Sequence, residues 1–294
     1  MPLVATLPMN VPPDLRHLAE DVLGAIAMSR FATTDSVMAY GGPRGLTQEL
    51  LRDWCEAGLL ERLLARPDPL RSDEIEYLAL TSAGAIALSS ATGRQFEGVT
   101  KGRLRRSSQK RMHDVWVGEM ALAAQSLAAD GQLDLLGVEV DDRKLATVVH
   151  VAELGKDLER IVLQPDLLVV TKGPMGNEAL IIEVDRGTTA PRRMEIRYRG
   201  YLAWQREFGP ERDFHVKALR VLTLVPNEAR LERLHHAALE ANDGRRSGFL
   251  VFGLLQNYVT ALANRWLEPS ARTLGGEPGH RTRLLAPRSG TQAN

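Results

Sequence analysis

The hydrophobic pattern in the first third of the chain predicts three successive helices. Within residues 13–30, apolar positions recur every three or four residues, as in an amphipathic helix, at Leu15, Leu18, Val22, Leu23 and Ile26. A second helix is expected at 32–42, where Thr33 or Thr34 can serve as the N-cap and two glycines end the pattern. The third, within 44–63, carries an apolar stripe and a C-cap glycine at 58: Leu46, Leu50, Leu51 and Trp54.

The pattern then changes to short strands. Residues 59–65 and 75–81 predict two strands joined by a loop containing Pro and Asp, and 82–93 predicts a closing helix. Three helices followed by a β-hairpin is the order of a winged helix-turn-helix, which we expect over residues 13–92. Its third helix would enter the major groove of double-stranded DNA. The residues expected to meet phosphates or base edges are Arg44, Gln48 and Arg52.

Two features of this region keep alternatives open. The loop of the hairpin is mostly acidic, which makes it a poor phosphate ligand, so a small helical domain for protein contact or dimerisation is the alternative. The next segment, 93–112, is predicted to be a basic linker that contacts the DNA backbone, or simply a solvated linker. Its basic residues are Lys101, Arg103, Arg105, Arg106, Lys110 and Arg111, with no acid among them.

Helical and strand patterns alternate over residues 113–267. A helix is expected at 113–131, and helices also at 191–208, 226–242 and near 254–267. Strand character is found at 133–142, 144–154, 161–170, 178–185, 216–225 and 248–255. This order predicts an α/β (α+β) domain with a mixed sheet. Residues 268–294 are rich in Gly, Pro, Arg and Thr, and we expect a disordered tail.

Length and composition limit the number of domains, the cellular compartment and the partners that we expect. A length of 294 residues is enough for two domains. A single cysteine, Cys55, cannot build a disulfide framework or a multi-cysteine zinc site, so a reducing compartment fits. No apolar run approaches the ~20 residues that span a bilayer, and no signal peptide is recognised, so we expect a cytoplasmic protein without a membrane partner. Basic and acidic residues balance at 37 each, which neither demands nor excludes nucleic acid.

Three carboxylates interrupt the apolar runs at 161–170 and 178–185. Alternate residues of a strand share a face, so Glu183 and Asp185 should project together at the end of their strand, and Asp166 on the neighbouring strand should lie beside them. Three converging carboxylates repel one another unless a cation neutralises them. Their hard oxygen atoms suit Mg²⁺ or Mn²⁺. Glu119, on the preceding helix, is a plausible fourth ligand.

The spacing of these acids carries a resemblance. Pro165-Asp166 followed by Glu183-x-Asp185 resembles the PD-(D/E)xK nuclease core, whose order is helix, three strands, helix, strand. Together with the winged helix, "HDVWVGEMAL", "IIEVDRGT" and "RYRGYL", it makes residues 14–258 similar to the bacterial replication-relaxation family, associated with plasmid replication, mobilisation and DNA relaxation. The resemblance implies a divalent metal on Asp166 and Glu183, with Glu119 matching a further family glutamate, and a metal-activated water that attacks the scissile phosphate.

The chain departs from the motif at one position, since the family expects lysine where Asp185 stands. Arg193 and Arg197, four residues apart on the next helix, are the candidates to supply the missing positive charge. The alternative is an ion-pair network with no metal and no chemistry. Three functions therefore remain open: a metal-dependent DNA endonuclease, a non-catalytic accessory protein of plasmid replication or transfer, and a transcriptional regulator. A homodimer, or plasmid replication and transfer proteins, are open as partners.

Overall fold

The chain forms two compact units whose boundary falls between Ser126 and Leu127. The computed structural model describes residues 13–65, 75–99, 108–140, 145–151, 159–174, 176–207, 209–258, 266, 271–276, 282 and 284–285. Both units mix helices and strands, so the predicted α/β class is confirmed at this level. Within the described residues, no helix combines the length and the apolar character needed to cross a membrane.

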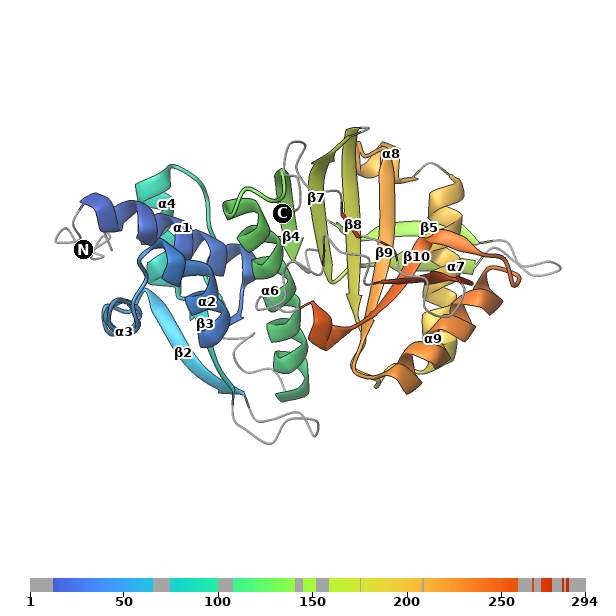
Figure 1. Ribbon diagram of the computed structural model, residues 1–294, viewed down its shortest axis with the longest axis horizontal. Coiled ribbons are helices and arrows are strands. Elements are labelled where there is room, and N and C mark those ends of the chain that lie inside the picture. The colour runs from blue at the N-terminus through green and yellow to red at the C-terminus, as the bar shows by residue number, and fades with distance from the viewer. Residues whose placement is uncertain are drawn as a thin grey trace. The chain divides into compact units, whose positions relative to one another are not determined.

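The first unit contains short helices and a small antiparallel sheet (Figure 1). Its elements are α1 (Pro13–Ser29), β1 (Ala32–Thr33), α2 (Thr34–Gly41), the 3-10 helix η1 (Gly42–Arg44), α3 (Gln48–Glu56), β2 (Leu60–Ala65), β3 (Ile75–Leu80), α4 (Ser82–Thr92) and the first part of α6 (Ser108–Ala129). The sheet has the order β1-β3-β2. The predicted helices and hairpin are therefore present, while the two-residue strand β1 was not predicted.

Threonine N-caps start three of these helices. Thr33 accepts a hydrogen bond from the Ser36 amide at 3.2 Å, as predicted for α2. Thr47 and Thr81 cap α3 and α4 in the same way, each from the amide three residues on. Because the caps and the apolar stripe agree, α3 buries Leu51 and Trp54 in the core of the unit and turns its opposite face to solvent.

Helix α6 differs from its predicted place. It begins at Ser108, inside the expected linker, and as far as Ser126 it groups with the first unit and not with the second. Gly118 lies so close to the turn after α1 that a Cβ there would overlap the Phe31 carbonyl oxygen. Further along α6, the Gln125 amide donates to Ser29 Oγ at 3.1 Å. The two units therefore divide near residue 126 and not at the expected residue 113, because these contacts fix most of α6 to the first unit.

The second unit is built on a mixed six-stranded sheet. Its elements are β4 (Leu135–Val140), β5 (Thr147–Val151), β6 (Glu159–Leu163), β7 (Leu167–Gly173), β8 (Gly176–Val184), α7 (Pro191–Arg206), α8 (Gly209–Phe214), β9 (Ala218–Val225), α9 (Glu228–Ala241), β10 (Ser247–Leu254), the 3-10 helix η3 (Leu255–Asn257) and β11 (Arg272–Leu274). The sheet order is β11-β10-β9-β8-β7-β4. Strands β4, β7 and β8 are antiparallel neighbours, β8, β9 and β10 are parallel, and β11 is antiparallel to β10.

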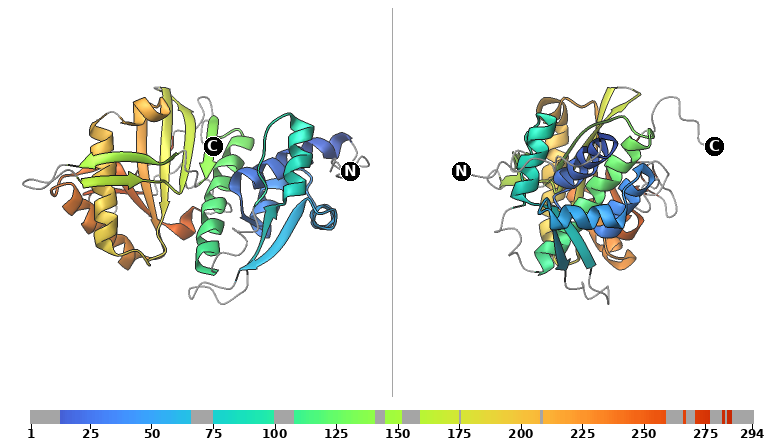
Figure 2. Two further views of the ribbon diagram at one scale, coloured as in Figure 1. Left: turned by 180° about the vertical axis from the view of Figure 1, so that it is seen from behind. Right: turned by 90° about the vertical axis from the view of Figure 1, so that its left-hand side faces the viewer.

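The apolar run at 161–170 is not one strand, as expected, but two. It breaks at Gln164 and Pro165, because proline has no amide hydrogen for a sheet ladder. Its first part, β6, pairs with β5 in a separate hairpin that lies against α7 (Figure 2). Gly200 permits this approach, since a Cβ there would come within 2.9 Å of side-chain atoms of Ile161 and Leu163.

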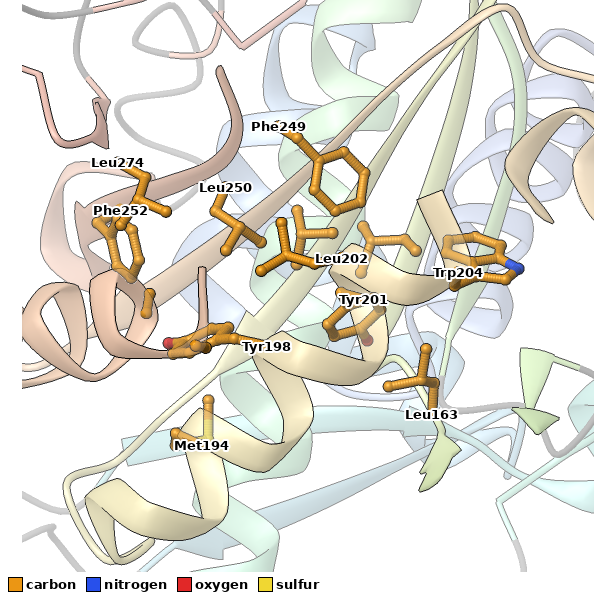
Figure 3. Packing of buried hydrophobic residues seen from close by; sticks show 14 of the residues in the cluster. Leu163, Met194, Tyr198, Tyr201, Leu202, Trp204, Phe249, Leu250, Phe252 and Leu274 are labelled. Atoms are coloured by element: carbon orange, nitrogen blue, oxygen red, sulfur yellow. The ribbon is translucent and has the colours of Figure 1, made fainter. Parts of the chain in front are cut away.

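Helices α7 and α9 pack side by side on one face of the sheet. Figure 3 shows part of this core, where Tyr198 and Tyr201 of α7 lie near Leu250 and Phe252 of β10. The rings of Tyr198 and Phe252 meet edge to face, with centroids 5.9 Å apart. Consequently, polar groups on this face of β8 are enclosed by two helices.

The predicted C-terminal disorder is wrong for part of the tail. Residues 272–274 form β11 at the edge of the sheet, and Leu274 is 1% exposed within the core. Three residues are too few to leave a periodic pattern, so the strand depends on its partner β10 and not on local sequence. Of the short helix expected near 254–267, the structure describes η3, and most of the remainder lies outside the described residues.

Candidate functional site

The hairpin of β7 and β8 brings Asp166 and Glu183 to neighbouring positions. Leu167 pairs with Ile182, so Asp166, one residue before β7, lies opposite Glu183. The Asp166 carboxylate also accepts a hydrogen bond from the Val184 amide at 2.8 Å, which fixes it beside the end of β8. The sequence prediction that these two acids lie close together therefore agrees with the strand register.

Glu183 is buried and contacts two side chains of α7, an ion-pair partner and a hydrogen-bond donor. Its side chain is 2% exposed, at the end of β8 where the sequence predicted it. Arg197 Nε lies 3.0 Å from Glu183 Oε1, and the Tyr201 hydroxyl donates to the same oxygen. Arg197 also donates to the Gln164 carbonyl oxygen. The carboxylate thus faces α7 and is shielded from solvent.

The cluster holds Arg197 charged and Tyr201 protonated. Burial lowers the pKa of Arg197, but the negative charge of Glu183, with smaller contributions from Tyr201 and Asp166, outweighs it and leaves the pKa raised. Burial raises the pKa of Tyr201 well above its usual value, and the neighbouring Glu183 raises it further. Across the working pH range, Arg197 is therefore a fixed cation and Tyr201 a fixed hydrogen-bond donor.

Asp185 is engaged by Arg230 of α9, which the sequence analysis did not identify. Arg230 Nε donates to Asp185 Oδ2 at 2.7 Å and Arg230 Nη2 to Oδ1 at 3.1 Å, a bidentate pair. The Gly187 amide donates to Oδ2 at 3.0 Å, and Arg230 also reaches the Thr189 carbonyl oxygen. Both side chains of the pair are at most 4% exposed. The sequence contained one indication that Arg230 is buried, because this residue falls on the apolar stripe of α9 with Leu234 and Ala238.

The other predicted members of the site lie elsewhere. Arg193 is exposed on α7, whereas Arg197, one turn later, reaches the acids. Glu119 is engaged within the first unit, where it accepts from the Thr33 amide at 2.8 Å, from the Thr33 hydroxyl at 3.0 Å and from the Ser36 hydroxyl. The expected role of Glu119 as a metal ligand is therefore replaced by one in holding the start of α2.

The donor set does not suit a divalent cation. Among the described residues, no group of three or more His, Cys, Asp or Glu side chains is placed to hold a metal. An ion at Glu183 or Asp185 would have to displace the guanidinium of Arg197 or Arg230, each of which already neutralises its carboxylate. The acids are therefore engaged in buried ion pairs, Glu183 with Arg197 and Asp185 with Arg230, whereas the sequence alternative expected Arg193 and Arg197 as the partners.

In the first unit, the predicted DNA-facing residues lie on and before α3. Arg44 lies over the Tyr40 ring, with Cζ 4.6 Å from the centroid, and Gln48 and Arg52 are exposed. Arg52 lies between two acids, 3.6 Å from Glu49 and 4.0 Å from Glu56. Asp53 is also exposed, so the solvent face of α3 carries more acid than base.

Part of the predicted basic linker can also be placed. Lys110 is exposed and Arg111 is half-buried at the start of α6. The remaining basic residues of this segment lie outside the described residues: Lys101, Arg103, Arg105 and Arg106.

Comparison of the chain with family models, with curated proteins and with solved structures found no match. The functional argument therefore depends on the geometry of the two units and on the sequence itself.

Proposed function

We propose that the chain is a DNA-binding protein whose second unit is a non-catalytic, nuclease-like platform. The observation that carries DNA binding is the topology of the first unit. Its order of α1, α2, α3 and the β2–β3 hairpin, with a sheet of order β1-β3-β2, supports a winged helix-turn-helix in which α3 is the recognition helix. Buried Leu51 and Trp54 hold α3 so that Gln48 and Arg52 face outward.

The distribution of charge indicates that α3 and the basic segment make different contributions to DNA binding. Because Glu49, Asp53 and Glu56 surround Arg52, α3 contributes little net attraction to phosphates. The electrostatic part of the affinity then falls to the basic segment Lys101–Arg111, which releases counterions from the duplex. Under this proposal, α3 reads base edges and the basic segment supplies backbone contacts.

The second unit supports the nuclease-like resemblance in its order but not in its chemistry. Helix α6, most of which groups with the first unit, and strands β4, β7 and β8 are followed by α7 and β9. This is the order helix, three strands, helix, strand, with β5, β6 and α8 as additions. Its acids, however, are neutralised by arginines from α7 and α9. We therefore assign this unit a docking role, as in the accessory proteins of plasmid replication or transfer that the family resemblance implies.

Fluorescence anisotropy with labelled duplexes tests DNA binding. Wild type should bind at ~50 mM salt, with the logarithm of its affinity falling linearly with the logarithm of salt concentration. Replacing Lys101, Arg103, Arg105 and Arg106 by alanine should weaken binding to all duplexes and reduce the salt slope by about one per lost phosphate contact. The exposed α9 residue Arg233 provides the control, since Arg233→Ala should bind as wild type. No binding by wild type at low salt would overturn the proposal.

A plasmid-nicking assay tests the non-catalytic part separately. With Mg²⁺ or Mn²⁺ present, wild type and an Asp166→Ala, Glu183→Ala double variant should leave supercoiled plasmid equally intact. Nicking by wild type that disappears in the double variant would show that the cluster is an active site. DNA binding would survive that result, because it depends on the first unit.

The acidic face of α3 favours a second candidate, in which the first unit docks a basic segment of another protein. A Glu49→Gln, Glu56→Gln double variant discriminates between the two. If α3 faces a duplex, removing two negative charges reduces repulsion and tightens DNA binding. If α3 faces a protein and the DNA contact lies elsewhere, the DNA affinity should stay unchanged, because salt screens the two distant charges from the duplex.

A further inference from the structure

A buried histidine on α9 connects that helix to the last strand of the sheet. His235 is 5% exposed, and its ring meets the ring of Phe252 from β10 edge to face, with centroids 5.3 Å apart. The Gly275 amide, in the turn directly after β11, donates to His235 Nε2 at 3.0 Å. An accepting nitrogen carries no hydrogen, so this contact requires the neutral ring with its hydrogen on Nδ1.

We propose that His235 is a pH-sensitive latch that holds β11 and its following turn against α9, and that protonation of the ring opens it. Protonation places a hydrogen on Nε2, which then points at the Gly275 N–H, and the hydrogen bond between them is lost. Opening would release Leu274, which is 1% exposed, and would free the outer edge of β10. The latch would thus control whether the six-stranded sheet ends in β11 or in an unpaired strand.

The charged groups around the ring decide how readily it protonates. From β11, Arg272 places a positive charge nearby, although it is paired with Glu232 of α9. His236 follows on the same helix and is paired with Glu240 at 3.4 Å. On the β10 side, the ring faces apolar Phe252. The positive charge nearest to His235 is therefore that of Arg272, and the carboxylate of Glu232 is already neutralised by Arg272.

One contact acts in the opposite direction. The Thr273 carbonyl oxygen lies 3.3 Å from Nε2 and could accept from a protonated ring, but it already accepts from the Gly276 amide at 3.1 Å. Burial, and then the Arg272 charge, lower the pKa of His235 despite this contact. The latch is therefore closed at neutral pH.

The sign of the pH response follows from this depressed pKa. The opened strand binds a proton more readily than the closed one, because the freed ring returns to an ordinary pKa near ~6.5. Stability of the closed state is complete above that value and is lost as the pH falls toward the pKa of the buried ring. Between these two pKa values, the ratio of open to closed molecules rises by up to about tenfold for each unit that the pH falls.

Hydrogen–deuterium exchange by mass spectrometry measures the opening. Exchange of a peptide covering 271–276 is followed in the full chain from about pH 7.5 to about pH 4.5, after correction for the intrinsic pH dependence of amide exchange. Wild-type protection should fall by up to about tenfold per pH unit at the acid end. A peptide from β9, at the centre of the sheet, should keep its protection and so separates latch opening from global unfolding.

Two variants make the test specific. His235→Gln places an uncharged carbonyl acceptor near Gly275 at every pH, so the pH dependence of the β11 peptide should disappear. His236→Gln changes the adjacent histidine, whose side chain is 75% exposed, and should respond as wild type does. A flat wild-type profile, or equal pH dependence in wild type and His235→Gln, would overturn the latch.

Nuclear magnetic resonance gives a measurement on wild type alone. The ring resonance of His235 should titrate below the ordinary histidine pKa near ~6.5, and its change should coincide with the loss of β11 protection. If His235→Gln does not fold, this titration still decides the matter. A His235 resonance that titrates at the ordinary histidine pKa, or that titrates with no change in β11, would refute the latch.

Discussion

Replacing Arg230 by methionine should destabilise the second unit severely. The change keeps much of the apolar stem but removes the guanidinium that makes two hydrogen bonds to Asp185, at 2.7 and 3.1 Å. Asp185 would remain as a carboxylate in a site where its side chain is 2% exposed. Removing one partner of a buried ion pair costs about 3–5 kcal/mol, because the other charge is left without compensation.

Differential scanning calorimetry can measure this loss in the second unit. For a unit of this size, 1 kcal/mol corresponds to about 2–4 °C in Tm, so the expected decrease is about 6–20 °C. Arg233→Met is the matched control on the same helix, since Arg233 is exposed and its Nε donates to the Ala229 carbonyl oxygen within the helix. A surface change of this kind should alter stability by no more than about 0.5 kcal/mol.

A double variant tests the reason for the loss. In Asp185→Asn, Arg230→Met both charges are absent, and replacing a whole buried pair by neutral groups is often close to neutral in stability. The double variant should therefore be more stable than Arg230→Met alone. The reasoning would be refuted if Arg230→Met lay within about 1 kcal/mol of wild type. It would equally be refuted if removing the Asp185 charge restored nothing.

Two further predictions concern packing and acid stability. Gly118→Ala should destabilise the first unit by at least about 1–3 kcal/mol in urea unfolding, because the new Cβ would overlap the Phe31 carbonyl oxygen. Gly24→Ala, with no atom within 4 Å of its new Cβ, should instead stabilise α1 by about 0.5–1 kcal/mol, and similar effects at both sites would contradict the packing. The hydrogen bond from Arg212 lowers the pKa of Asp213, so the stability that Asp213 contributes is present above its unfolded pKa and is lost as the pH falls toward the lowered folded value. In calorimetry at decreasing pH, Asp213→Asn should reduce the acid-induced fall in Tm, and an unchanged fall would contradict this role.

The local signals in the sequence were sufficient for most helices and strands. The choice of Thr33 or Thr34 as N-cap and the stripe containing Leu51 and Trp54 correctly predicted α2 and α3, with Thr33 as the cap, since caps and periodicity act within one or two turns. The failures are elements that depend on distant partners. Strand β11 has three residues and exists because β10 provides the ladder, and β6 separates from β7 at Pro165 and pairs with β5.

In the candidate site, too, the contacts within one hairpin were predicted and the contacts between distant segments were not. Asp166 and Glu183 were predicted to be neighbours because a hairpin fixes its own register through a short connection. Arg230 joins Asp185 across 45 residues, and Glu119 joins Thr33 across 86, so neither pairing leaves a local pattern. Glu119 lies on the part of α6 that groups with the first unit, where its carboxylate accepts hydrogen bonds from Thr33 and Ser36.

The arrangement of the arginines explains how the fold accommodates two buried acids at the end of β8. Arg197 connects α7 to β8 through Glu183, and Arg230 connects α9 to β8 through Asp185. Both helices that cover the sheet are therefore fixed to the end of the same strand. A metal at this position would have to compete with two cations whose removal leaves buried carboxylates without partners, at a cost of several kcal/mol for each. The same ion pairs that disfavour a metal thus fix α7 and α9 to the end of β8.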